Sequence, residues 1–259
     1  MGELKSTLPD KASIRSASGN PCTIAGKPPL SSIMKSPRNR ISVALLLAIA
    51  CIPLGAEDSS IALFNGKDLS GWKNPYEWGK AEVVGDEIHL TADKKFFLVT
   101  EAQYADFVFE GEVHLPEGQA NSGFMFRCHV EPNKVYGYQA EIDGSDRRWS
   151  GGLYDEGRNK WLWPSQKGRT NVEAALAHET ESQAHFKKPE VRDALKRNDW
   201  NHIRITCRGN SIKIELNGVV TTEYTDDTDA KGFIGIQHHG EKGQTYRFRN
   251  LKIKELTTP

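Results

Sequence analysis

The chain lacks any excess of charge of one sign. Its 34 Lys and Arg residues balance 34 Asp and Glu residues, and no long run of like charge interrupts the sequence. A nucleic-acid-binding surface usually shows as a cluster of Lys and Arg. The sequence therefore predicts no nucleic acid partner.

Long apolar runs are missing after residue 56. A helix that crosses a bilayer needs roughly 20 consecutive apolar residues, and residues 57–259 contain no such run. We therefore expect no transmembrane helix in this part of the chain.

The marked apolar run of the chain lies near the N-terminus. Arg38 and Arg40 precede residues 41–52, and Ala48-Ile49-Ala50 supplies the small residues that signal peptidase recognises. This layout is typical of a signal peptide. We expect residues 1–56 to be a targeting segment and the protein to be exported, to the periplasm or outside the cell. Two alternatives stay open. Either residues 1–33 are a wrongly assigned extension and the protein starts at Met34, or the signal peptide has a long N-terminal region before its apolar run.

Export would change the charge of the protein. Residues 1–56 hold seven Lys and Arg but two Asp and Glu, so residues 57–259 carry a net charge of −5. A mildly acidic exported protein again argues against nucleic acid binding.

Cysteine is scarce, with four in the chain. Cys51 follows three small or apolar residues, so it is a possible lipid anchor that would make the protein a membrane-anchored lipoprotein. Cys128 and Cys207 share strand parity with large apolar residues, and both are expected to point into the core. Two cysteines permit one disulfide, but two buried free thiols fit equally well.

Several motifs of known chemistry are missing. The chain has no GxSxG element, no P-loop and no dinucleotide fingerprint, so we predict no cofactor. His238-His239 has no matching Cys or His spacing, which argues against a structural zinc site. A metal requirement for activity stays open.

What the chain does contain is a series of short strands with turns between them. Residues 107–115 alternate apolar and polar side chains, as a half-buried strand does. Asn217-Gly218 predicts a type I′ hairpin turn. The other candidate strands are residues 87–90, 97–100, 124–129, 136–143, 203–207, 212–216, 219–224, 232–239 and 246–256.

Many antiparallel strands at such spacing predict an all-β sandwich or jelly roll. Residues 171–196 alone look helical, with Asn171 as a possible helix cap. We therefore expect one domain over residues 57–259, with a helical or loop insertion at about 165–198.

Polar side chains alternate with apolar ones on several candidate strands. Glu141 and Asp143 lie two residues apart and so share a strand face. If the sheet curves, its polar face becomes a groove. We expect this groove to gather Arg127, Glu141, Asp143, Gln237 and His239. The opposite face, toward the second sheet, would then hold Phe124, Phe126, Tyr138, Ile142, Ile234 and Ile236.

Such a face has the groups that bind sugars. Carboxylates and guanidinium groups hydrogen-bond neighbouring hydroxyls, and aromatic rings stack on pyranose rings. Each residue also has a simpler reading, because outward polar residues are usually just solvated and the Trp residues could pack the insertion. The candidate substrate-binding residues are Gln139, Gln237, Tyr154, Asp155, Glu156, Trp149 and Trp161.

An ordered set of motifs from about Ile61 to Leu256 resembles the 3-keto-disaccharide hydrolase family. The motifs are Phe64-Asn65-Gly66-Lys67-Asp68-Leu69-Ser70-Gly71-Trp72, Asn121-Ser122-Gly123 with Arg127, Gly137-Tyr138-Gln139-Ala140-Glu141-Ile142-Asp143, Gly151-Gly152-Leu153-Tyr154-Asp155-Glu156, Asp199-Trp200-Asn201, Leu216-Asn217-Gly218, Gly232-Phe233-Ile234-Gly235-Ile236-Gln237 with His239-Gly240, and Phe248-Arg249-Asn250-Leu251-Lys252-Ile253-Lys254.

This resemblance implies a concanavalin A-like lectin/glucanase jelly roll, exported from bacteria, that cleaves 3-keto-glycosides or 3-keto-disaccharides. The partner would be an oligosaccharide or glycoside substrate. Residues 170–197 are longer than the family leads us to expect, and they could reshape one end of the groove.

A 3-keto group makes the C2 proton of a glycoside acidic, so a base could start an elimination. Glu141 and Asp143 are the candidate carboxylate pair, Arg127 would polarise the ketone, and His239 would transfer protons. Asp155 and Glu156 are alternative carboxylates. A direct two-carboxylate glycosidase mechanism, a non-catalytic carbohydrate-binding module and a structural envelope protein are the competing hypotheses.

Overall fold

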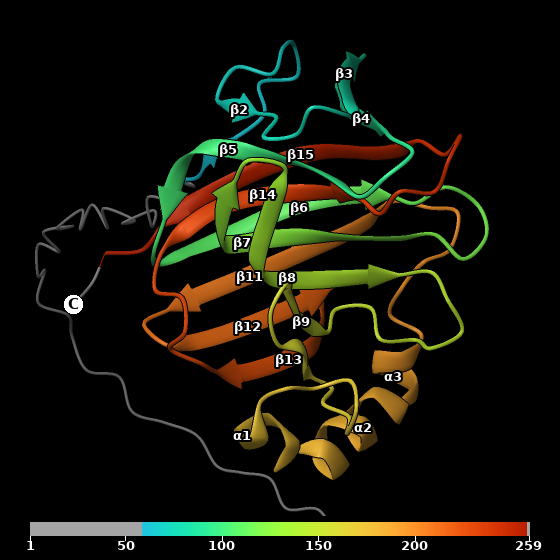
Figure 1. Cartoon of the computed structure of the whole chain (residues 1–259), viewed down its shortest axis with the longest axis vertical. Helices are drawn as coiled ribbons and strands as arrows, with labels where there is room; N and C mark the ends of the chain where they lie inside the picture. The colour runs from blue at the N-terminus through green and yellow to red at the C-terminus, as the bar shows by residue number, and fades with distance from the viewer. Residues whose placement is uncertain (1–58, 258–259) are drawn as a thin grey trace, which may run out of the picture. The chain divides into compact units, whose positions relative to one another are not determined.

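The computed structural model describes residues 59–257. The predicted targeting segment, the alternative start at Met34 and the possible anchor at Cys51 lie outside the described residues. Two antiparallel β-sheets face each other in this part of the chain (Figure 1). The protein is therefore an all-β sandwich of the jelly-roll type, as the sequence predicts.

One sheet has eight strands. Its order is β13 (Val219–Thr225), β12 (Ser211–Leu216), β11 (Asn201–Arg208), β6 (Phe107–His114), β15 (Tyr246–Glu255), β4 (Glu87–Thr91) and β3 (Lys80–Val84), with β1 (Ile61–Ala62) paired to β15.

The other sheet has seven strands, and it carries most of the candidate residues. Its order is β10 (Lys160–Trp163), β9 (Leu153–Glu156), β8 (Lys134–Asp143), β7 (Asn121–Glu131), β14 (Gly232–His238), β5 (Phe96–Tyr104) and β2 (Trp72–Lys73). The face of this sheet that points away from the eight-stranded sheet is called the outer face below.

The core lies between the sheets and follows the predicted strand parity. On β6, every second residue is buried, from Phe107 to Val113. From the seven-stranded sheet, the core receives the predicted set Phe124, Phe126, Tyr138, Ile142, Ile234 and Ile236. Removing each such side chain from water stabilises the fold by roughly 1.5–3 kcal/mol.

The hairpin between β12 and β13 forms where the sequence predicts it. Asn217 and Gly218 have φ angles of 51° and 83°, and a type I′ turn requires positive φ at both central positions. Asn tolerates this conformation better than most side chains, and Gly adopts it without cost.

A bulge in β7 changes the parity that the sequence predicts. The pairing with β8 shifts between Phe126 and His129, and Arg127 adopts a φ of 46°. Beyond this bulge Cys128 lies on the outer face, buried in an apolar cluster with Phe97 and Val135. Cys128 is therefore buried, as predicted, but its predicted parity with Phe124 and Phe126 is wrong, because a β-bulge reverses the alternation of side chains.

Cys207 does point into the inter-sheet core, as predicted. Cys128 and Cys207 are both buried free thiols. They lie on different faces of different sheets, so they do not form a disulfide.

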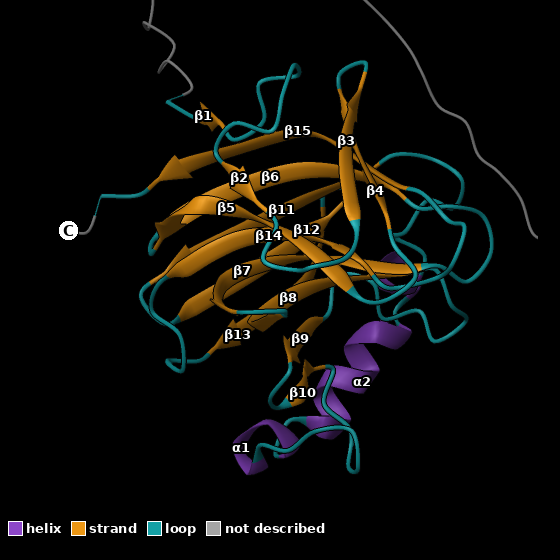
Figure 2. Ribbon diagram, turned by 45° about the horizontal axis from the view of Figure 1, so that its top comes forward, coloured by secondary structure: helices purple, strands orange, loops and turns teal. Residues whose placement is uncertain are grey.

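The insertion between β10 and β11 contains three short helices. They are α1 (Glu173–Leu176), α2 (Glu179–Lys187) and α3 (Pro189–Arg192). Helices α1 and α2 lie beside β9 and β10, at one side of the sandwich (Figure 2). Helix α1 begins after Val172 without a side-chain cap, and the Asn171 amide instead donates to the Arg158 carbonyl. None of the helices within residues 59–257 is long and apolar enough to cross a membrane.

Candidate functional site

Strand β8 places three polar side chains in a row on the outer face. Gln139, Glu141 and Asp143 alternate with Ala140 and Ile142, which are buried in the core between the sheets. The row is itself buried, because the Glu141 residue is only 5% exposed and Asp143 only 2%. Sequence parity thus predicted the face correctly, but it did not predict that the row would be buried.

A glycine on the neighbouring strand makes room for a contact between two glutamines. A Cβ atom at Gly123 would lie 2.1 Å from Nε2 of Gln139, so any other residue would displace the Gln139 side chain. Across this gap, Nε2 of Gln139 donates to Oε1 of Gln237 at 2.8 Å. The Gln139 Oε1 atom is buried without a hydrogen-bond donor. An unsatisfied buried acceptor is costly, and a ligand hydroxyl would satisfy it.

The Glu141 carboxylate has two partners among the described residues. It accepts a hydrogen bond from Nδ2 of Asn121 at 2.6 Å, and Nη2 of Arg147 lies 3.3 Å from the same oxygen. Burial, together with the charge of Asp143, raises the pKa of Glu141 to about 7, against the opposing effects of Asn121 and Arg147. A carboxyl group with this pKa exchanges protons readily near neutral pH.

Asp143 is held much more tightly than Glu141. Its carboxylate accepts hydrogen bonds from the backbone N–H and the hydroxyl of Ser145, both at 2.9 Å. Nε of Arg147 donates to it at 2.8 Å, and Nη2 lies 2.7 Å away. Because its lone pairs are occupied in this way, Asp143 orients Arg147.

Arg147 is the central cation of the site, and the sequence analysis missed it. Its guanidinium group lies over the rings of Trp161 and Trp149, 4.6 Å and 5.4 Å from their centroids. Trp161 in turn packs edge-on against Tyr154 at 5.2 Å. The predicted aromatic residues therefore do gather here, but they support a cation. The position of Arg147, four residues after Asp143 and two before Trp149, was the sequence feature that could have identified it.

Strand β9 adds two of the predicted residues to the outer face. Tyr154 pairs with Gln139 across the strands, and burial together with the charges of Glu156 and Glu141 raises its pKa to about 12. Glu156 forms an ion pair with Lys95 at 2.8 Å. Lys95 lies on the loop before β5, and no sequence pattern pointed to it.

Arg127 does not belong to this site, which corrects the prediction. The bulge turns its side chain toward the end of the inter-sheet space, where the residue is only 1% exposed. Its guanidinium group donates to the carbonyls of Ala105, Gly209 and Asp229, and it lies 3.1 Å from the carboxylate of Asp106. Arg127 ties loops together and is not placed to polarise a ketone beside Glu141.

The Asp155 side chain lies on the face opposite to Glu141, so it does not fit its predicted role in the site. It pairs with Tyr138, a core residue, and accepts hydrogen bonds from Arg158 and Asn159. Burial raises its pKa above the ordinary value. Since neighbouring strand residues point to opposite faces, Asp155 cannot share the outer face with Tyr154 and Glu156.

His239 lies just beyond the end of β14, and its side chain is largely exposed. Its Nδ1 atom contacts the Glu241 carboxylate at 2.8 Å. The structure records no contact between His239 and Glu141 or Asp143 within residues 59–257. Of the five residues expected to meet in one groove, Glu141, Asp143 and Gln237 share the outer face, Arg127 does not, and His239 stands apart.

A cavity of about 310 Å³ opens beside Arg147. One wall consists of residues 146–149, and the other is formed by Gln183, Phe186, Lys187 and Arg192 of the helical insertion. The size fits a small ligand. The insertion therefore forms one wall of a cavity beside Arg147, and the lining of this cavity does not include Glu141 or Asp143.

The described residues contain no group of three or more His, Cys, Asp and Glu side chains arranged to hold a metal ion. The site as built offers a protonatable carboxyl group, a cation, amides and aromatic rings. These groups bind hydroxyls and move protons.

The outer face of this jelly-roll sandwich thus carries groups that suit the hydroxyls and rings of carbohydrates. Residues 59–254 match the family described as the 3-keto-alpha-glucoside-1,2-lyase-like domain. This match covers most of the chain, and the protein belongs to that family. No curated protein sequence matches the chain.

Solved structures share the fold. One is a putative glycosyl hydrolase from Parabacteroides distasonis, with 21% identity, a TM-score of 0.50 and coverage of 76% of this chain and 99% of that one. Another is the carbohydrate recognition domain of Emp46p, with 13% identity, a TM-score of 0.51 and coverage of 77% and 98%. A carbohydrate-binding module from Bacillus subtilis has 18% identity, a TM-score of 0.48 and coverage of 71% and 96%.

Proposed function

We propose that the protein cleaves 3-keto-glycosides by elimination across the C1–C2 bond, with Glu141 as the acid–base group. The observation that carries this proposal is the placement of Glu141. It is a buried carboxyl group on the outer face, held by one amide and one guanidinium group. Membership of the 3-keto-alpha-glucoside-1,2-lyase-like family supports the same substrate class.

The reaction begins with proton removal next to the ketone. The Glu141 carboxylate takes the C2 proton, and the electron pair of the C–H bond forms an enolate on the C3 oxygen. The ketone then re-forms as the C1–C2 double bond is made and the C1–O bond breaks. The electron pair of the C1–O bond leaves with the aglycone oxygen, and this oxygen takes the proton from Glu141. Water that later adds across the double bond would give net hydrolysis.

The neighbours of Glu141 have separate roles in this scheme. Arg147 uses Nε and Nη2 for the two carboxylates, which leaves Nη1 to donate to the developing enolate oxygen. Gln139 Oε1 accepts a hydrogen bond from a sugar hydroxyl, because it has no donor in the structure. Asp143 acts as a positioning residue, since it fixes the guanidinium group of Arg147.

A pair of matched variants tests this proposal. Glu141→Gln keeps the shape of the side chain but removes the acid–base group, and it should lower turnover of a 3-keto-glucoside by about a hundredfold or more. Glu131→Gln makes the same change at an exposed carboxylate at the end of β7 and should leave turnover unchanged. Full activity of Glu141→Gln would overturn the assignment.

A non-catalytic carbohydrate-binding module is the second candidate. The observation in its favour is that His239, the residue expected to transfer protons, contacts Glu241 instead of Glu141 or Asp143. Such a protein would bind a glycan and release no product from it. Sugar binding that persists without any turnover of keto or unoxidised glycosides would favour this alternative.

We also propose that the protein is exported under the direction of residues 1–56. The basic residues followed by an apolar run and a small-residue motif support this proposal. Retention through a lipid on Cys51 is a variant of the same proposal.

A further inference from the structure

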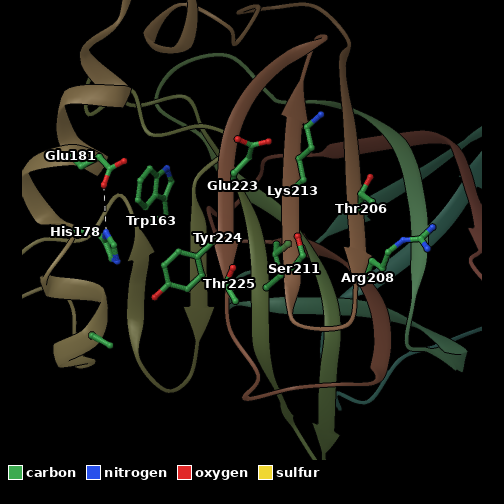
Figure 3. Close-up of a pocket in the computed structure, with 12 residues that line it drawn as sticks. Trp163, His178, Glu181, Thr206, Arg208, Ser211, Lys213, Glu223, Tyr224 and Thr225 are labelled. Carbon is green, nitrogen blue, oxygen red and sulfur yellow. Dashed lines mark hydrogen bonds and ion pairs between the residues drawn. The ribbon is translucent and has the colours of Figure 1, made fainter. Parts of the chain in front are cut away.

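A second cavity lies on a different part of the molecule, where the insertion meets the edge of the eight-stranded sheet. Its volume is about 640 Å³, within the range of ligand sites. Strands β11, β12 and β13 form one side, and residues of β10, α1, α2 and the loop between these helices form the other (Figure 3). We call it the edge cleft; it is lined by Trp163, Ala174, His178, Glu181, Thr206, Arg208, Ser211, Ile212, Lys213, Glu223, Tyr224 and Thr225.

Trp163 provides an unsatisfied donor in the wall of the edge cleft. The residue is only 8% exposed, and its Nε1 atom is buried without an acceptor. Its ring lies between His178 and Tyr224, with 6.4 Å between ring centroids in each case. An indole N–H that is buried normally finds a partner, so this donor points to an acceptor on a ligand.

Two exposed side chains line the edge cleft beside Trp163 (Figure 3). The side chains of His178 and Glu181 are 53% and 73% exposed, and they contact each other at 3.4 Å. Long exposed side chains change rotamer readily. Rotation of these two side chains would widen the cleft next to the Trp163 ring.

Charges in the edge cleft cancel. Arg208 and Lys213 are matched by Glu181 and Glu223. A site for a polyanion would show an excess of cations, and this one does not. Among the described residues, neither Arg208 nor Glu223 has an ion-pair partner, so both are available to hydrogen-bond a ligand.

The remaining lining groups match the chemistry of a sugar. The Tyr224 and Trp163 rings provide apolar surface, while Thr206, Ser211 and Thr225 supply hydroxyl groups that both donate and accept. Few ligands other than carbohydrates combine an apolar ring face with many neutral hydroxyls at its rim.

Strand β10 separates the edge cleft from the site around Glu141. Trp161 pairs with Tyr154 and Trp163 pairs with Leu153, with a register shift between them. As a result, Trp161 lies under Arg147 on the outer face, whereas Trp163 lines the edge cleft. Two tryptophans of one short strand thus belong to two different sites.

We propose that the edge cleft is a second, non-catalytic binding site for a sugar unit of a neutral glycan, with Trp163 donating to a ring or hydroxyl oxygen. Such a site would hold a longer glycan on the protein independently of the reaction at Glu141. The proposal stands whether or not the protein proves to be a lyase.

Indole N–H signals in NMR spectra of ¹⁵N-labelled protein distinguish the two sites. The Trp163 signal is assigned by its loss in Trp163→Phe, and the protein is titrated with cellohexaose, maltohexaose and mannohexaose, and separately with hexagalacturonate. At least one neutral hexasaccharide should shift the Trp163 signal. The Glu141→Gln variant should show the same shift, which separates this proposal from the proposed reaction.

Two substitutions measure the contribution of the lining. Trp163→Phe removes the donor, and Glu223→Gln changes an exposed carboxylate; each should weaken binding of that hexasaccharide by about three- to tenfold. Glu101→Gln, an exposed carboxylate on β5, is the matched control and should bind as before.

Three results would overturn the proposal. One is the absence of any Trp163 shift at millimolar neutral hexasaccharide. Another is a Trp163 shift with hexagalacturonate alone, which would mean an anion site. The third is equal hexasaccharide affinity in the wild type, Trp163→Phe and Glu223→Gln proteins.

Discussion

At the scale of single residues, the burial of Glu141 couples its chemistry to the stability of the fold. The pKa of Glu141 is about 7 in the folded protein, against an ordinary value of 4.5. Between these pH values the unfolded chain releases the proton while the folded chain keeps it. The folded state is therefore favoured below pH 4.5, and this contribution is lost as the pH rises toward 7.

The Glu141→Gln variant lacks this titration. We expect the unfolding free energy of the wild type to fall relative to that of the variant between pH 4.5 and 7, by at most about 1.4 kcal/mol per pH unit. Urea unfolding at a series of pH values measures it. Parallel pH profiles for the two proteins would show that the pKa of Glu141 is not raised.

The same titration sets the pH dependence of the proposed reaction. Since the carboxylate form of Glu141 takes the C2 proton, turnover should rise with pH up to about 7 and then level off. Initial rates from pH 5 to 9 give the profile. A rate that falls across pH 7 would assign Glu141 the role of an acid in the limiting step.

Gly123 tests the contact between the two glutamines. Alanine at this position would force the Gln139 side chain away, at a cost of about 1–3 kcal/mol in unfolding free energy, and it should weaken substrate binding. In the Gln139→Ala background, Gly123→Ala should cost much less, because the clashing amide is gone. Equal costs in both backgrounds, measured by urea unfolding, would contradict this account of Gly123.

At the scale of elements, the β7 bulge explains why Arg127 is structural. Arg127→Leu leaves three loop carbonyls and Asp106 without their donor, and it should destabilise the protein by roughly 3–5 kcal/mol. Arg208→Leu, at an exposed arginine, is the control. The folded fraction of Arg127→Leu should keep wild-type KM and kcat. A large loss of kcat with unchanged stability would restore the catalytic role that the sequence suggested.

Regular strands were predictable from the sequence because alternation has a strict period of two. This period gave the core faces of β6 and β8, and with them the shared face of Glu141 and Asp143. A bulge leaves no mark in such a pattern, which is why Arg127 and Cys128 were assigned to the wrong faces.

Residues on loops were harder to place than residues on strands. Arg147 follows β8 after a turn, and Lys95 precedes β5. Their approach to the outer face depends on the path of the chain in three dimensions. Asp155 was placed wrongly for a simpler reason: its neighbours Tyr154 and Glu156 were taken as candidates with it, although strand alternation puts it on the opposite face.

At the scale of the whole molecule, the proposal of export makes a direct prediction. The protein isolated from its native host should begin within a few residues of Glu57, or at a lipid-modified Cys51. N-terminal sequencing and intact mass measurement distinguish these results. A cytoplasmic protein that begins at Met1 would contradict export.

The two sheets support the proposed reaction by keeping Glu141 out of contact with bulk water. The core fixes β7 and β8, and these strands hold Asn121 and Glu141 at 2.6 Å. The loop after β8 then supplies Arg147 and Trp149, and strand β10 supplies Trp161. Removal of the C2 proton by Glu141 is the central step that this arrangement supports.

That step is tested most directly by the rate of cleavage of a 3-keto-glucoside carrying deuterium at C2. We predict that the purified protein cleaves the deuterated compound more slowly than the protiated one and does not cleave the matched unoxidised glucoside. The Glu141→Gln variant should cleave neither the deuterated nor the protiated 3-keto-glucoside. Cleavage of the unoxidised glucoside at a similar rate, with no isotope effect, would contradict the account.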